Sequence, residues 1–211
     1  MVPMIKKALI FSIYLAVLTA LFTLLSLTAL AAPMTPHGTA RFETPTATVN
    51  ITNNSRNYQT VWRDAIRAWN RTGAFSFVLS KQSDAQITAQ SNPSIGASYT
   101  GFTVIHVNNQ DLINQVTSTL NPTVMATFGY RPSQEVNVAE HELGHAMGLS
   151  HSPNKDSVMY AANRFVSIQP ADVAGVQNLY ATQAPVSNGT LSAVRLRGTP
   201  VIRPHHSGSN D

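Results

Sequence analysis

Residues 141–151 read His-Glu-Leu-Gly-His-Ala-Met-Gly-Leu-Ser-His, and they are the most informative stretch of the chain. On a helix, His141 and His145 lie one turn apart on the same face, so both imidazoles can reach one metal ion. His151 follows after a net rotation of about 240° and can join them only if the helix ends first. Gly148 is placed to end it, because glycine adopts a positive φ at little cost.

Three converging imidazoles predict a catalytic zinc site, since such sites use three protein ligands and keep a fourth position for water. Glu142 is rotated by about 100° from His141, so it cannot share the metal but can stand beside that water as a general base. Imidazole also suits copper, nickel or iron, so another metal is one alternative. The other is that the three histidines bind no metal and are surface or packing residues. The glutamate beside an open position favours zinc and hydrolysis.

The surrounding sequence indicates one α+β domain over about residues 40–181. Short strands with β-branched and aromatic residues are expected at 46–52, 75–79, 85–89 and 101–107. Helices with an apolar stripe are expected from about Tyr58 to Gly73, from Ser133 as N-cap to Met147, and over Gln169–Tyr180. Residues 111–128 are ambiguous, because Asn121-Pro122 breaks them, and are interpreted as a long, partly irregular connection.

The N-terminus is typical of an export segment. Lys6 and Lys7 precede an uncharged apolar run over residues 8–32, and Ala29-Leu30-Ala31 fits a cleavage site. We expect a signal peptide at 1–31, followed by a short linker at 32–39, and therefore a secreted or extracellular protein. An uncleaved membrane tether through residues 8–32 is the alternative, because the run is long enough to span a bilayer.

Composition excludes several function classes. The 211 residues include no cysteine, which rules out disulfides, thiolate zinc ligands and a thiol nucleophile. The formal net charge is +4, with two of the basic residues in the leader and no basic cluster interleaved with aromatics, so nucleic-acid binding is not expected. Residues 182–211 are rich in Ser, Pro, Gly and Asn and predict a flexible C-terminal tail, which includes His205 and His206. A cysteine-free exported protein suggests a bacterial source.

With these motifs in place, the sequence resembles the metzincin metalloendopeptidases, and among them the matrixins. Their long zinc motif is matched by His141 through His151, and Ser157-Val158-Met159-Tyr160 resembles the methionine turn beneath their metal. The resemblance implies a twisted mixed five-stranded sheet with one antiparallel edge strand and three helices. It further implies an active-site cleft over one catalytic zinc, with Met159 as a hydrophobic floor, and a 99–107 strand as the edge that pairs with an extended substrate peptide.

The departures from this family are also informative. Without a cysteine, latency through a thiol that caps the zinc is excluded. His106 is the only histidine between His37 and His141, so the family's second, structural zinc is expected to be absent and His106 is interpreted as a strand side chain. Calcium is supported by no motif, because Asp84 and Asp111 are isolated acids.

The sequence therefore predicts an exported zinc endopeptidase that hydrolyses peptide bonds of extracellular proteins or peptides. Zinc held by His141, His145 and His151 would activate a water molecule, and Glu142 would act as general base. The alternatives are a non-catalytic zinc-binding cell-surface module with the same fold and a membrane-tethered processing protease. A monomer is favoured, and no partner beyond an extended peptide or protein substrate is expected.

Overall fold

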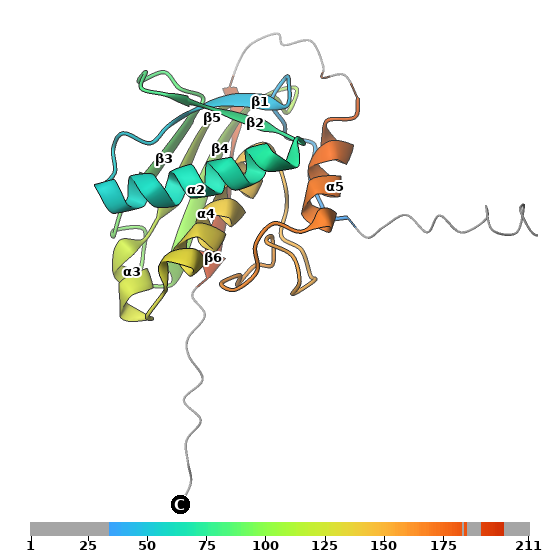
Figure 1. Ribbon diagram of the computed structural model, residues 1–211. Coiled ribbons are helices and arrows are strands. Elements are labelled where there is room, and N and C mark those ends of the chain that lie inside the picture. Colours follow the sequence, from blue (N-terminus) through green and yellow to red (C-terminus); the bar gives the residue numbers. More distant parts are fainter. Residues whose placement is uncertain (1–33, 183, 185–190, 201–211) are drawn as a thin grey trace, which may run out of the picture. The chain divides into compact units, whose positions relative to one another are not determined.

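The computed structural model describes residues 34–182, 184 and 191–200 (Figure 1). The expected leader and tether, and His205 and His206 of the tail, lie outside the described residues. No helix in the described part of the chain is long and apolar enough to cross a membrane.

A mixed sheet forms the centre of the domain. Its strands are β1 (Thr46–Asn50), β2 (Ser76–Ser80), β3 (Ile87–Ser91), β4 (Tyr99–Asn108), β5 (Ile113–Leu120) and β6 (Leu191–Pro200), in the order β2-β1-β3-β5-β4-β6. Strand β1 runs parallel to β2 and β3, and β3 runs parallel to β5, whereas β4 is antiparallel to β5. The α+β class and the mixed five-stranded sheet are confirmed, with β6 added as a sixth strand beside β4.

Four described helices accompany the sheet: α2 (Arg56–Thr72), α3 (Pro122–Thr127), α4 (Pro132–Met147) and α5 (Pro170–Leu179). Ser55 caps α2 by accepting from the Tyr58 N–H at 3.4 Å, and the helix ends at Gly73 with φ 70°. Its predicted apolar stripe is buried throughout, and Trp69 donates from Nε1 to the Glu140 carbonyl at 2.8 Å. This bond joins α2 to α4, which lie side by side over the sheet (Figure 1).

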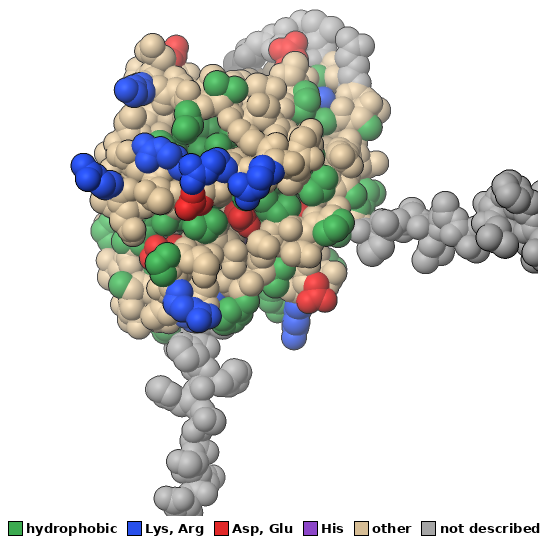
Figure 2. All heavy atoms as spheres, viewed as in Figure 1, with side chains coloured by type: hydrophobic (Ala, Val, Ile, Leu, Met, Phe, Trp, Pro, Cys, Tyr) green, Lys and Arg blue, Asp and Glu red, His purple; other side chains and the backbone are tan. Residues whose placement is uncertain are grey.

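The outer face of α2 carries several arginines, and basic side chains form a row across this face with acidic side chains beside them (Figure 2). The aromatic residues of α2 point inward, as the burial of Tyr58, Trp62 and Trp69 shows. This helix therefore offers charge without the exposed rings on which bases stack.

Two local expectations are wrong. Residues 111–128 form strand β5 and the short helix α3 rather than an irregular connection. The sequence pattern does not predict strand β5, because its buried positions include Ser118 and Thr119 and it therefore lacks an alternation of apolar and polar residues. Helix α4 has Arg131, not Ser133, at its N-cap, because Pro132 suits the first turn and the Gln134 side chain accepts from the Arg131 N–H at 2.9 Å.

The flanks of the domain also differ from expectation. Residues 34–39 are packed against the domain rather than forming a linker: Thr35 is buried, and His37 pairs with Leu149 in an isolated β-bridge. Residues 191–200 are not a flexible tail but strand β6, antiparallel to β4. As a consequence β4, expected to be an open edge, has a neighbour on both sides.

Candidate active site

The structure brings His141, His145 and His151 together. Their ligand nitrogens all lie within 4.8 Å of one another, and the Nε2 atoms of His141 and His145 are 3.0 Å apart. Two nitrogens bound tetrahedrally to one zinc ion lie about 3.3 Å apart, so this pair fits the metal. Among the described residues no other group of His, Cys, Asp or Glu clusters in this way, and His106 is not part of this one.

Backbone carbonyls orient the first two imidazoles. Nδ1 of His141 donates to the Val158 carbonyl at 2.7 Å, and Nδ1 of His145 donates to the Leu149 carbonyl at 2.9 Å. With both Nδ1 atoms protonated, both Nε2 atoms present lone pairs to the same point, as metal ligands require. Burial lowers the pKa of His141 to about 3, so this imidazole is neutral near pH 7.

Gly148 makes the turn that carries the third histidine. The residue has φ 109°, and its N–H bonds to the His145 carbonyl at 2.9 Å, as expected for a helix that ends in a left-handed residue. A Cβ at this position would collide with the carbonyl oxygen of Ala40. The same turn places the Leu149 carbonyl against Nδ1 of His145. The turn that ends α4 therefore also orients the His145 imidazole.

Met159 lies against α4, the helix that bears His141 and His145. Its side chain is fully buried, and its sulfur occupies the space that a side chain at Gly144 would need. The Met159 carbonyl accepts from the Ser152 N–H at 2.8 Å, which ties this turn to the residue after His151. The turn and the third histidine are therefore held in register by backbone contacts.

Asp172 is a buried carboxylate that the sequence did not single out as functional. It lies in the first turn of α5 and accepts from the Val158 N–H at 3.0 Å and the Gln169 N–H at 2.9 Å. The hydroxyls of Thr35 and Ser157 each donate to its other oxygen at 2.5 Å. Because the carbonyl of Val158 accepts from His141, Asp172 supports this histidine through one backbone residue.

Glu142 is fully buried beside the triad, one residue after His141. Its Oε2 accepts a hydrogen bond from the Thr103 hydroxyl at 2.5 Å, and its Oε1 lies so close to Gly101 that any Cβ there would clash. Both contacts come from β4. Thr103 was not identified from the sequence, because nothing local marks a threonine in a strand as the partner of a helix residue 39 positions later.

The segment between Met159 and α5 is anchored by Arg164. The guanidinium donates to Gln134 Oε1 at 3.1 Å and to the Gly129 carbonyl at 2.8 Å, and it lies over the Tyr130 ring. The neighbouring Phe165 is exposed. The Arg164 carbonyl also accepts from Asn137 Nδ2 at 3.1 Å, so the backbone of this segment is fixed to α4.

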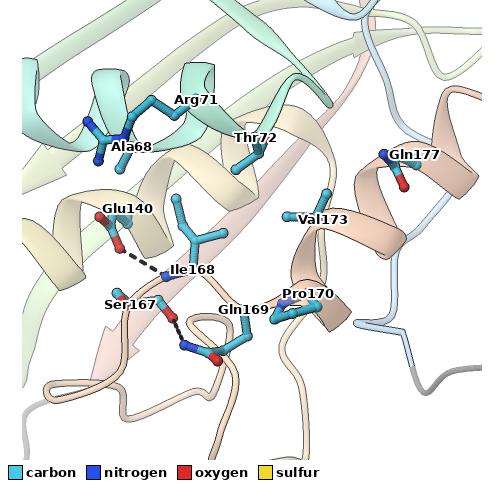
Figure 3. A pocket seen from close by; sticks show the side chains of 10 residues that line it. All are labelled: Ala68, Arg71, Thr72, Glu140, Ser167, Ile168, Gln169, Pro170, Val173 and Gln177. Carbon is cyan, nitrogen blue, oxygen red and sulfur yellow. Dashed lines mark hydrogen bonds between the residues drawn. The ribbon is translucent and has the colours of Figure 1, made fainter.

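A separate cavity of about 600 Å³ lies between α2, α4 and α5 (Figure 3). Its lining includes Glu140, whose Oε2 accepts from the Ile168 N–H at 3.2 Å, but none of the three clustered histidines. Burial raises the pKa of Glu140 to about 7, against the opposing effects of the Ile168 N–H and of Arg71. The cavity is therefore not the place where the histidines converge.

Comparison with known proteins identifies this part of the chain. A model of the matrixin family matches residues 107–181. Stromelysin-2 of Rattus norvegicus is 43% identical over 63 residues, which cover 27% of this chain and 13% of that protein. Metalloendoproteinase 4-MMP of Arabidopsis thaliana is 41% identical over 61 residues (27% and 18%), and matrix metalloproteinase-19 of Mus musculus is 44% identical over 79 residues (32% and 15%).

The matched stretches span less than a fifth of each of these relatives. Residues 107–181, which the family model matches, include the clustered histidines, the turn at Gly148 and the methionine turn. Residues 107–181 are therefore similar to the matrixin family of zinc metalloendopeptidases.

Proposed function

We propose that the chain is an exported zinc endopeptidase that hydrolyses peptide bonds of extracellular proteins or peptides. The observation that carries this proposal is the convergence of three imidazoles, two of them with the tautomer fixed for metal binding, beside a buried glutamate. A bound zinc ion would lower the pKa of a water molecule and polarise the scissile carbonyl.

In this mechanism His141, His145 and His151 would hold the metal. Glu142 takes the proton from the attacking water and delivers it to the leaving amine as the peptide bond breaks. Thr103 donates to Oε2 of Glu142 and so orients this carboxylate. Met159 supplies apolar packing beneath the ligands, and calcium is possible but has no support from the sequence.

The test is cleavage of an unfolded protein by the wild type and by Glu142→Gln, compared at matched zinc content. Glutamine keeps the size and the hydrogen-bond acceptor of glutamate but cannot take up a proton. We expect a loss of roughly 10²–10⁴ in kcat with unchanged zinc binding. Equal rates in the two proteins would remove Glu142 from the mechanism, and zinc binding without cleavage by either would favour a non-catalytic zinc-binding module.

Export belongs to the proposal as well and rests on the sequence of residues 1–32. Mass spectrometry of the mature N-terminus decides between cleavage after Ala31 and a retained tether. Recovery of an intact apolar segment in the membrane fraction would replace the secreted protease by a membrane-anchored one. The bacterial source and the monomeric state stay predictions.

A further inference from the structure

Strand β6 covers one edge of β4 along its whole length. The pairing is antiparallel and runs from Tyr99, opposite Pro200, to Asn108, opposite Leu191. The other edge of β4 is paired with β5. The backbone N–H and C=O groups of β4 are thus shared between a neighbour from inside the domain and a segment that follows α5 in sequence (Figure 1).

The register places β6 next to the residues of β4 that touch the proposed general base. Thr103 donates to Glu142 and is paired with Arg197, while Gly101, which packs on the same carboxylate, is paired with Thr199. Neighbouring strands are about 4.8 Å apart. The backbone of residues 197–199 therefore runs one strand spacing from the part of β4 that holds Glu142.

We infer that residues 191–200 occupy this edge as an extended substrate peptide would, so that the chain inhibits its own active site in cis. The inference rests on the proposed function. A strand edge offers one set of hydrogen-bonding groups, and an incoming peptide that adds as a strand must displace whatever is paired there. A segment tethered to the same chain has an effective concentration in the millimolar range, so it competes well with dissolved substrates.

This arrangement would restrain activity in a chain that has no cysteine to do so. Its expected signature is kinetic. If the edge is covered in nine molecules out of ten, the apparent affinity for substrate falls about tenfold, whereas the rate from the bound complex is unchanged. The effect therefore appears in KM and not in kcat.

The experiment uses the full chain with two adjacent prolines, Arg195→Pro and Leu196→Pro. In an antiparallel pair, neighbouring residues point their N–H groups to opposite sides, so one of the two substitutions removes a donor to β4. The matched control carries Arg195→Ala and Leu196→Ala, which shorten the same side chains and keep both N–H groups. Hydrogen exchange of the β4 amides in the zinc-free chain reports the pairing independently of activity.

We expect the proline pair to speed exchange of the β4 amides and to lower KM for a fluorogenic peptide roughly tenfold at constant kcat, whereas the alanine pair behaves as the wild type. A synthetic peptide of residues 191–200, but not a scrambled one, should inhibit the proline variant competitively. The inference would be overturned if the proline pair exchanged the β4 amides faster without a change in KM. It would also be overturned if the β4 amides that face β6 were already unprotected in the wild type. If the zinc-loaded wild type and proline variant both cleave nothing, the proposed function fails instead.

Discussion

The carboxylate of Asp172 offers a stringent test of how the fold supports the histidine cluster. It contacts no histidine, yet it accepts four hydrogen bonds, one of them from the N–H of Val158. The carbonyl of that same residue orients His141. We therefore expect replacement of Asp172 to weaken both the fold and zinc binding, and the two effects can be worked out separately for alanine and asparagine.

Asp172→Ala removes all four acceptor contacts. The hydroxyls of Thr35 and Ser157 lie 3.2 Å apart and can bond to each other, so the N–H groups of Val158 and Gln169 are the ones left without their acceptor. A buried group that loses its partner costs about 1–3 kcal/mol, which gives about 2–6 kcal/mol of lost unfolding free energy. Loss of an outer partner of a ligating histidine weakens metal affinity by roughly 10–100-fold.

Asp172→Asn should be much milder, because both N–H groups bond to the same oxygen, Oδ2. An amide oxygen in that place keeps both bonds, and the new amide nitrogen can donate to the hydroxyls of Thr35 and Ser157. What is lost is the charge near the N-terminus of α5 and the charge-assisted strength of the bonds, about 1–2 kcal/mol.

The assay is urea unfolding of the zinc-free protein together with zinc competition against a chromophoric chelator. Asp156→Ala is the control, since Asp156 is an exposed acid two residues before Val158 and should change either quantity little. The reasoning is refuted if the alanine variant keeps wild-type zinc affinity, or if asparagine proves as damaging as alanine. Unchanged zinc affinity in the alanine variant would mean that the Val158 carbonyl does not depend on Asp172 to orient His141. Equal damage by asparagine and alanine would mean that Oδ2 is not the shared acceptor of the two N–H groups.

Two further substitutions test the surroundings of the site. Thr103→Val should lower kcat roughly tenfold by releasing the Glu142 carboxylate, whereas Ser118→Ala, which removes the other hydroxyl bonded to Thr103, should leave kcat nearly unchanged; equal effects would contradict this role. Glu140→Gln should gain stability over the wild type as the pH rises from 4.5 to about 7, because the folded chain holds a proton that the unfolded chain releases. The gain reaches at most about 3 kcal/mol and is measured by urea unfolding at pH 4.5 and 8; a gain independent of pH would show that Glu140 does not titrate.

Local information in the sequence was sufficient for the histidine cluster. The spacing of His141 and His145 is a helix period, and Gly148 marks the stop after which His151 can turn back, so each element of the geometry depends on a few adjacent residues. The apolar stripe of α2 was predictable for the same reason, since all its members are buried as the periodicity required. Periodicity failed at β5, where buried Ser118 and Thr119 satisfy their polar groups within the fold.

The supports of the site could not be read from the sequence. Asp172 meets Thr35 across 137 positions, and Thr103 meets Glu142 across 39. An aspartate in the first turn of a helix or a threonine in a strand has an ordinary local explanation, so neither stands out before the chain is folded. Asp172 and Thr103 can be recognised as supports of the site only when the hydrogen-bond partners of their buried oxygens are known.

The sequence by itself determined the histidine cluster, the helix that carries two of its members and the class of fold, because helix periodicity and glycine turns are encoded over short distances. The tertiary structure decided what holds those histidines in place and what lies along β4. Strand pairing is made by backbone groups that every residue possesses, so the docking of residues 191–200 on β4 leaves little trace in composition. The docking follows from the edge of β4 that β5 does not pair with, whose N–H and C=O groups can accept a further strand.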